Sequence, residues 1–143
     1  MATENMRKIE YVNSYFPILS VKANDIEQSE LIAERELDVR AQIRKSTEEN
    51  CYIVLVDVEE TSEEAPYQFQ ILAVGVFEVR YEDDAKSEAP EAQEVAFNGA
   101  QILYGQIREQ LAMMTSRSVY GTLFLPAYYF SNENFIAGHE LDE

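Results

Sequence analysis

Histidine and cysteine, the side chains that most often act as base or nucleophile, each occur once in this 143-residue sequence. His139 lies close to the end of the chain, where a solvated tail histidine is the default, and a Ser-His-Asp or Cys-His pair would have to recruit it. Cys51 opens an apolar segment, which favours a buried, unreactive thiol. A zinc site therefore lacks ligands, and an internal disulfide is excluded.

Carboxylates are the commoner candidates for chemistry, and they fall in three clusters: Glu59-Glu60, Glu63-Glu64 and Glu82-Asp83-Asp84. Paired acids could perform acid–base chemistry or hold Mg²⁺. All three clusters lie in or beside predicted loops, so we prefer solvated loop charge and keep a small enzyme as an alternative. Gly99 and Gly105 are too far apart for a phosphate-binding loop. We therefore expect no enzyme, no metal site and no cofactor.

The overall composition restricts the class of protein and its partners. A net charge of −16 repels nucleic acid and anionic membranes, so we expect neither as a partner. An apolar content of 46% argues against disorder, and the length suits one domain over residues 1–143, with 1–7 and 131–143 flexible. Met1–Glu10 lacks the apolar part of a signal peptide, and no apolar run is long enough to span a membrane. These features predict a cytoplasmic protein without membrane insertion.

Strand-like segments fill the first half of the chain. Leu37–Arg44 alternates apolar and polar residues, as a half-buried strand does, whereas Cys51–Glu59 is almost continuously apolar and β-branched, which is typical of a central strand. Lys8–Lys22 also suits a strand, but Pro17 removes a ladder donor and predicts a kinked, bulged or edge strand. Ala23–Glu36 is mostly polar and is interpreted as a connection.

Tyr67–Tyr81 is the longest predicted strand. Alternate residues from Tyr67 onward form one apolar face, and the opposite face is polar at its ends but apolar in the middle, at Leu72, Val74 and Val76. A strand that is apolar on both faces needs cover on both, so we expect these three residues to contact another subunit. Gly75 indicates a bulge.

A helix is predicted to begin at Asn98, a preferred N-cap residue, and to continue to Arg117, whereas Glu82–Glu94 is interpreted as a loop. Gly105 within this helix indicates a backbone packed closely on the sheet or on another subunit. Apolar residues recur at helical spacing and share one face of the helix: Ile102, Leu103, Ile107, Leu111 and Met114. Strands followed by one helix predict an α+β fold, a four-stranded antiparallel sheet covered on one face.

The aromatic and apolar run Leu123–Phe130 follows the helix and has two readings. It either belongs to the core or covers a sheet edge, or part of it lines a groove for unfolded chains. Aromatic and aliphatic side chains on mobile segments can bind diverse apolar sequences, and an exposed sheet edge could add backbone hydrogen bonds.

The helix and this run resemble the end of the SecB family of export and antifolding chaperones. Family members typically read ILFPYxRE…SRGxFPxLxLxPxNF, and the order of the preceding strands also fits. The matching residues here are Ile102-Leu103, Ile107-Arg108-Glu109, Thr115-Ser116-Arg117, Leu123-Phe124-Leu125-Pro126 and Phe130.

The resemblance implies a homotetramer, a dimer of dimers with helices between two sheets, that binds unfolded polypeptides. Its subunit interfaces are expected to include the apolar helix face at Leu103, Ile107 and Leu111, besides the strand residues named above. The client-binding groove that it implies is lined by Leu31, Ile32, Leu123, Phe124, Leu125, Tyr128, Tyr129 and Phe130.

The chain also departs from the family pattern. The early acids that help to dock the translocase motor SecA are missing from Tyr11–Ile18, which puts SecA binding in doubt. The family's second helix has only the short polar tail after Phe130 as its counterpart. We therefore expect an ATP-independent holdase, acting in export or for a dedicated client such as an antitoxin. The alternative is a structural or assembly protein on the same fold that has no client groove.

Overall fold

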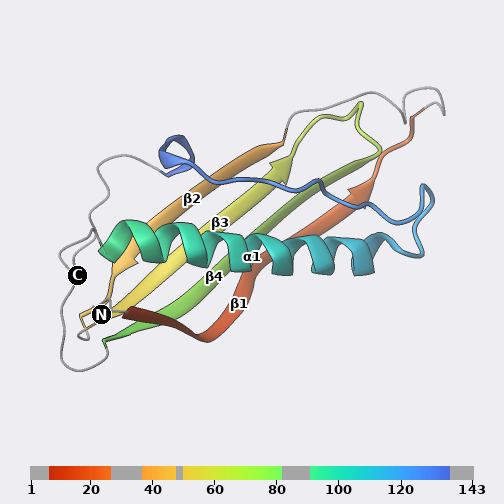
Figure 1. Ribbon diagram of the computed structural model, residues 1–143. Helices are drawn as coiled ribbons and strands as arrows, with labels where there is room; N and C mark the ends of the chain where they lie inside the picture. Colours follow the sequence, from red (N-terminus) through yellow and green to blue (C-terminus); the bar gives the residue numbers. More distant parts are fainter. Residues whose placement is uncertain (1–6, 27–36, 48–49, 82–90, 136–143) are drawn as a thin grey trace.

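The computed structural model describes residues 7–26, 37–47, 50–81 and 91–135. These residues form one antiparallel sheet followed by one long helix, which confirms the predicted α+β fold (Figure 1). The elements are β1 (Arg7–Ala23), β2 (Asp38–Lys45), β3 (Cys51–Glu60), β4 (Tyr67–Tyr81), α1 (Glu91–Thr115) and a short 3-10 turn (Asn132–Asn134).

The strands lie in the order β1-β4-β3-β2, so the two apolar strands β3 and β4 are central and β1 and β2 form the edges. The β1–β4 register shifts between Tyr15 and Ile18, which confirms that Pro17 lies in an irregular edge strand. Gly75 pairs in register with Ser14 on one side and Val54 on the other, so the predicted bulge at Gly75 is wrong.

The core lies between α1 and one face of the sheet. Alternate β4 side chains from Phe69 to Val79 point toward the helix, and Leu103, Ile107 and Leu111 of α1 are fully buried against them. A Cβ atom at Gly75 would lie 2.8 Å from Cδ2 of Leu103. Gly75 is therefore needed for the close approach of helix and sheet, not for a bulge.

The helix begins well before the predicted residue. Asn98 lies inside α1, where its side-chain Nδ2 donates to the Glu94 carbonyl oxygen at 2.9 Å, so the predicted N-cap at Asn98 is wrong. Val95 and Ala96 are buried and extend the apolar face, and acidic residues in the first turn suit the positive end of the helix dipole. The helix ends at Thr115, so Arg117 lies beyond it.

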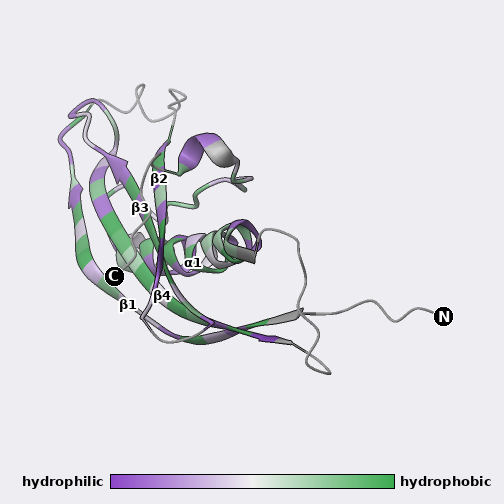
Figure 2. Cartoon of the chain, turned by 90° about the vertical axis from the view of Figure 1, so that its left-hand side faces the viewer, coloured by the Kyte–Doolittle hydropathy of each residue, from purple (hydrophilic) through white to green (hydrophobic). Residues whose placement is uncertain are grey.

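The chain turns after α1 and runs back along the helix on the same face of the sheet, ending beside β2 (Figures 1 and 2). We call residues 121–130 the return segment. Within the tail that starts at Ser131, Phe135 packs against the core and forms a parallel β-bridge with Ala41 of β2. Within the described ranges, α1 contains too few apolar residues to cross a membrane.

Candidate polypeptide-binding groove

Thr115 at the end of α1 fixes where the return segment starts. Its hydroxyl is fully buried, donates to the Leu111 carbonyl oxygen at 2.8 Å and accepts from the Leu123 backbone nitrogen at 2.8 Å. Between these points the chain turns through Ser118 and through Gly121, whose φ of 81° suits glycine. One buried hydroxyl therefore joins the last helical turn to the return segment.

Two side chains of α1 hold the backbone of the return segment. The Tyr104 hydroxyl donates to the Pro126 carbonyl oxygen at 2.7 Å, and Arg108 Nε donates to the Leu125 carbonyl oxygen at 3.1 Å. Burial raises the pKa of Tyr104 to about 12, an effect that the charge of Arg108 partly opposes, so Tyr104 is a neutral donor near pH 7. The backbone is thus fixed, whereas the outward side chains are not.

The return segment buries some side chains and exposes others. Leu125 is 4% exposed and belongs to the core, whereas Phe124 is 76% and Tyr129 is 86% exposed. Tyr128 and Phe130 are half-buried and pack against the ring of Tyr104, with centroids 5.6 and 6.0 Å from it. Two large aromatic side chains therefore lie in solvent on a backbone that α1 holds in place.

An apolar groove of about 200 Å³ lies between the return segment and the hairpin that connects β3 to β4. One wall of this groove is formed by Leu123, Phe124, Leu125 and Pro126. The hairpin, β4 and Leu37 before β2 contribute the other wall, which could not be predicted because nothing in the sequence pattern shows which loop the return segment will face. That wall consists of Leu37, Glu60, Ala65, Pro66, Tyr67 and Phe69.

A second hollow, of about 580 Å³, lies on the other side of Phe124, along the exposed surface of α1. Its walls include Gly105 and Met113, and Met113 is 64% exposed. Phe124 and Leu125 line both hollows, so this part of the return segment is a ridge between two concave surfaces. A Cβ atom at Gly105 would have no neighbour within 4 Å, so the prediction that Gly105 packs on the sheet is wrong.

Tyrosine hydroxyls fix the end of the groove. The Tyr120 hydroxyl donates to the Asn24 carbonyl oxygen at 2.5 Å and accepts from the Ile26 nitrogen at 3.1 Å. The Tyr67 hydroxyl donates to the Gly121 carbonyl oxygen at 2.7 Å and accepts from the Tyr120 nitrogen. These bonds connect the end of β1, the start of β4 and the turn before the return segment. They therefore hold the two walls of the groove in place relative to each other.

The remaining predicted site residues lie elsewhere. Leu31 and Ile32 fall outside the described residues. Leu72, Val74 and Val76 lie on the sheet face opposite α1, where Val74 is buried between its neighbours and the other two are half-buried.

The three helix residues expected at a subunit interface lie in this chain's own core. Leu103, Ile107 and Leu111 are each 0% exposed, because the helix packs this face on its own sheet. The helix surface open to a partner carries Ile102, Gly105 and Met113 instead.

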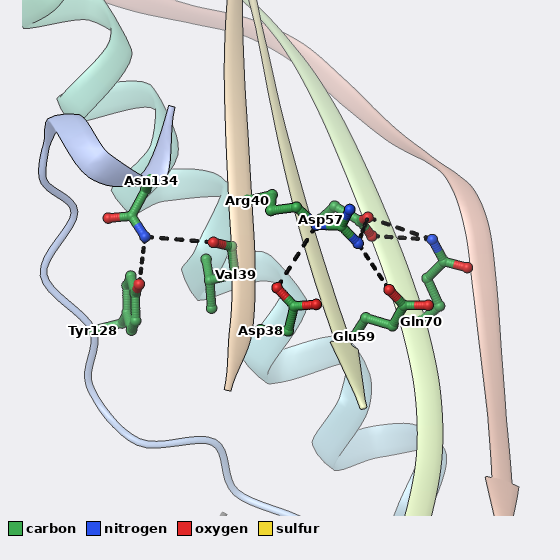
Figure 3. Close-up of polar contacts among 8 residues, drawn as sticks. All are labelled: Asp38, Val39, Arg40, Asp57, Glu59, Gln70, Tyr128 and Asn134. Atoms are coloured by element: carbon green, nitrogen blue, oxygen red, sulfur yellow. Dashed lines mark hydrogen bonds and ion pairs between the residues drawn. The ribbon is translucent and has the colours of Figure 1, made fainter. Parts of the chain in front are cut away.

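The face opposite α1 carries the main group of ion pairs. Arg40 on β2 contacts Glu59 at 2.8 Å and Asp57 at 3.5 Å on β3, and Asp38 at 3.7 Å on its own strand (Figure 3). Gln70 on β4 donates to Asp57. Because Arg40 is half-exposed, these contacts orient the edge strand more than they stabilise it.

Among the described residues, no three His, Cys, Asp or Glu side chains are grouped so that they could hold a metal ion. Cys51 is buried, and His139 and the Glu82–Asp84 cluster lie outside the described ranges. The side chains that line the groove are mainly apolar, on a protein whose net charge is −16.

Comparison with known proteins supports the fold. No protein-family model and no curated protein sequence matches the chain. A SecB-like chaperone of Mycobacterium tuberculosis, solved in complex with a ChAD peptide from the antitoxin HigA1, is similar with a TM-score of 0.61 and 12% identity, over 84% of this chain and 87% of that chain. A Streptococcus agalactiae protein of unknown function is similar with a TM-score of 0.54 and 9% identity, over 85% and 98% of the two chains. The four-stranded sheet followed by one long helix is a SecB-like fold.

Proposed function

We propose that the protein is an ATP-independent holdase that binds non-native polypeptide along the ridge at Phe124. The observation that carries this proposal is the exposure of two aromatic side chains on a backbone held by α1: Phe124, which lies between the two hollows, and Tyr129. Exposed aromatic patches of this kind mark interaction sites, since solvent exposure costs free energy that a partner recovers. The net charge of −16 keeps molecules that expose such patches apart.

The groove suits an unfolded chain better than a small ligand. It is open to the surface, and most of its walls are apolar side chains, with Glu60 among them. Such walls accept many side chains without a fixed register, which an unfolded client requires. The SecB-like neighbour binds an antitoxin peptide, and this supports a polypeptide as the ligand class here.

The proposal extends to the assembly and to the client. We propose a homotetramer in the cytoplasm, a dimer of dimers, serving either protein export or one dedicated client such as an antitoxin. The half-buried Leu72 and Val76 and the exposed helix surface at Ile102 and Met113 are surfaces that assembly could cover. The lack of the family's docking acids in Tyr11–Ile18 argues against SecA as a partner. Sedimentation at two protein concentrations tests the assembly, and a monomer at both contradicts it.

An aggregation assay tests the holdase activity. A chemically denatured client is diluted into buffer with and without the protein, and its light scattering is followed. We expect the native protein to suppress scattering at a small molar excess and Phe124→Ser to suppress it several-fold less. Val119→Ser is the matched control, since Val119 is 73% exposed but lines neither hollow.

Two results would contradict the proposal. Unchanged scattering at a clear excess of native protein would favour the structural or assembly protein instead. The half-burial of Tyr128 and Phe130 against Tyr104 favours that alternative, because these two side chains already have partners within the chain. Equal losses from Phe124→Ser and Val119→Ser would show that the ridge has no particular part in binding.

A further inference from the structure

The outer edge of β2 is covered by a very short piece of the chain itself. β2 pairs with β3 on one side only, so its other side presents backbone groups that a further strand could bind. Asn134 Nδ2 donates to the Val39 carbonyl oxygen at 3.4 Å (Figure 3). Phe135 forms its parallel bridge with Ala41. Residues 39 and 41 therefore direct their backbone groups away from β3, toward Asn134 and Phe135.

Side chains hold this short piece in place. The ring of Phe135 lies 5.7 Å from that of Phe97 on α1 and 6.4 Å from that of Phe130 on the return segment. The Asn134 amide also contacts the Tyr128 hydroxyl, and Figure 3 shows both bonds of this amide on the side of β2 away from Arg40. Phe135 follows the 3-10 turn that ends at Asn134, so this piece occupies the strand edge with one backbone bridge, one side-chain amide on a strand carbonyl and one aromatic side chain between two rings.

We propose that the edge of β2 is a strand-addition site for an extended polypeptide segment that runs parallel to β2, and that Asn134–Phe135 occupies this site in cis. The ligand is a segment with a large apolar or aromatic residue in the position of Phe135, preceded by an amide or hydroxyl side chain that reaches the Val39 carbonyl. The inference rests on the proposed function and assigns it a second contact surface. A client segment that bonds to β2 at several residues displaces the single bridge within the described chain.

The cis occupant sets a threshold for binding. A tethered segment competes at a local concentration of the order of millimolar, so weak ligands are excluded until they gain more contacts than Asn134–Phe135 makes. The charge of the protein adds a preference, because a net charge of −16 disfavours acidic segments. The site therefore favours neutral or basic extended segments that contain aromatic residues.

A peptide in trans tests the proposal directly. The probe is a fluorescent synthetic peptide with the sequence of residues 128–139 of this chain, and its anisotropy reports binding. The Asn134→Ala/Phe135→Ala variant should bind it at least tenfold more tightly than the native protein. Val119→Ala, at an exposed position away from β2, should bind it as the native protein does. Equal affinity of the native and the double variant, or no binding by either, overturns the proposal.

A reversible lock provides a second test that does not depend on the folding of the double variant. Neighbouring strands lie about 4.8 Å apart, so cysteines at the bridged positions can form a disulfide. In a Cys51→Ala background, Ala41→Cys/Phe135→Cys should bind the peptide when reduced and lose binding at least tenfold when oxidised. Equal binding by the oxidised and the reduced protein overturns the proposal.

The aggregation assay separates this inference from the proposed function. If the native protein suppresses aggregation and the oxidised, locked protein suppresses it equally well, the β2 edge is not a client contact, and the holdase proposal still stands. Peptide binding by the double variant without any suppression by the native protein supports the strand-addition site and contradicts the holdase.

Discussion

Alanine at three glycines of this chain should have effects that differ in sign, because the structure surrounds the glycines differently. A Cβ atom at Gly105 on α1 meets nothing within 4 Å. One at Gly99, on the same helix, lies 3.0 Å from Phe77 Cε2 and 3.0 Å from Val54 Cγ2. One at Gly75 on β4 lies 2.8 Å from Leu103 Cδ2 and 2.9 Å from Phe77 Cε2. These side chains are fully buried and have little room to move.

The magnitudes follow from two opposing effects. Within a helix, replacing glycine by alanine raises the free energy of unfolding by about 1 kcal/mol, and Gly105→Ala should show this gain alone. Overpacking a core costs about 1–3 kcal/mol, so Gly99→Ala should combine both effects and lower the free energy of unfolding by about 0–2 kcal/mol. Gly75→Ala has no helical gain, so it should lower that free energy by the full 1–3 kcal/mol.

Urea unfolding followed by circular dichroism measures all three variants against the native protein. A common slope of unfolding free energy against urea concentration would show that the variants expose the same surface when they unfold. A loss of stability in Gly105→Ala, or a neutral Gly75→Ala, would refute the helix–sheet packing described above. Repeating the measurement at two protein concentrations adds a check, because a loss at Gly105 that depends on concentration would place a partner's backbone at this residue.

Three further variants test individual contacts, and a fourth, Tyr129→Phe, serves as a control. Tyr104→Phe should cost about 1–2 kcal/mol through its lost hydrogen bond. Because the pKa of Tyr104 is raised to about 12, the native protein should lose stability as the pH rises from about 10 to 12, and Tyr104→Phe should lose less over the same range in urea titrations. Tyr120→Phe should cost about 1–3 kcal/mol in thermal unfolding, whereas Tyr129→Phe, at an exposed hydroxyl, should stay within about 0.5 kcal/mol. Arg40→Ala should cost about 0–1 kcal/mol and less in 1 M salt, and a larger, salt-independent loss would contradict a half-exposed ion-pair group.

The strands could be predicted from the sequence because their signal is local. Alternation at Leu37–Arg44 and the β-branched run from Cys51 place β2 and β3 to within a residue or two, and Pro17 marks the irregular edge strand. Tyr67–Tyr81 is predicted with its observed bounds, including the face that meets the helix.

The start of the helix and the role of its apolar face could not be predicted from local sequence signals. Asn98 carries the residue type of an N-cap, but burial of Val95 and Ala96 extends the helix past it, so tertiary packing overrides the local signal. Periodicity shows that Leu103 and Ile107 share a face and does not show whether that face meets the chain's own sheet or a second subunit.

Only one side of the candidate groove, the return segment, has a visible signal in the sequence. The aromatic character of the return segment is visible in the sequence, and so is the resemblance that suggests its use. Its opposite wall at Pro66 and Tyr67 depends on where the chain turns after Thr115, which a single buried hydroxyl decides. The contact of Phe135 with β2 likewise depends on two residues in a polar tail, which gives no periodic signal.

Photo-crosslinking tests the binding of unfolded polypeptide at the ridge most directly. A photoreactive phenylalanine analogue replaces either Phe124 or Arg80, which lies at the opposite end of β4 from the groove, and each protein is irradiated with an unfolded client. The account predicts crosslinks to the client from position 124, lost when the client is folded, and few from position 80. Equal crosslinking from both positions, or none from position 124, would contradict it.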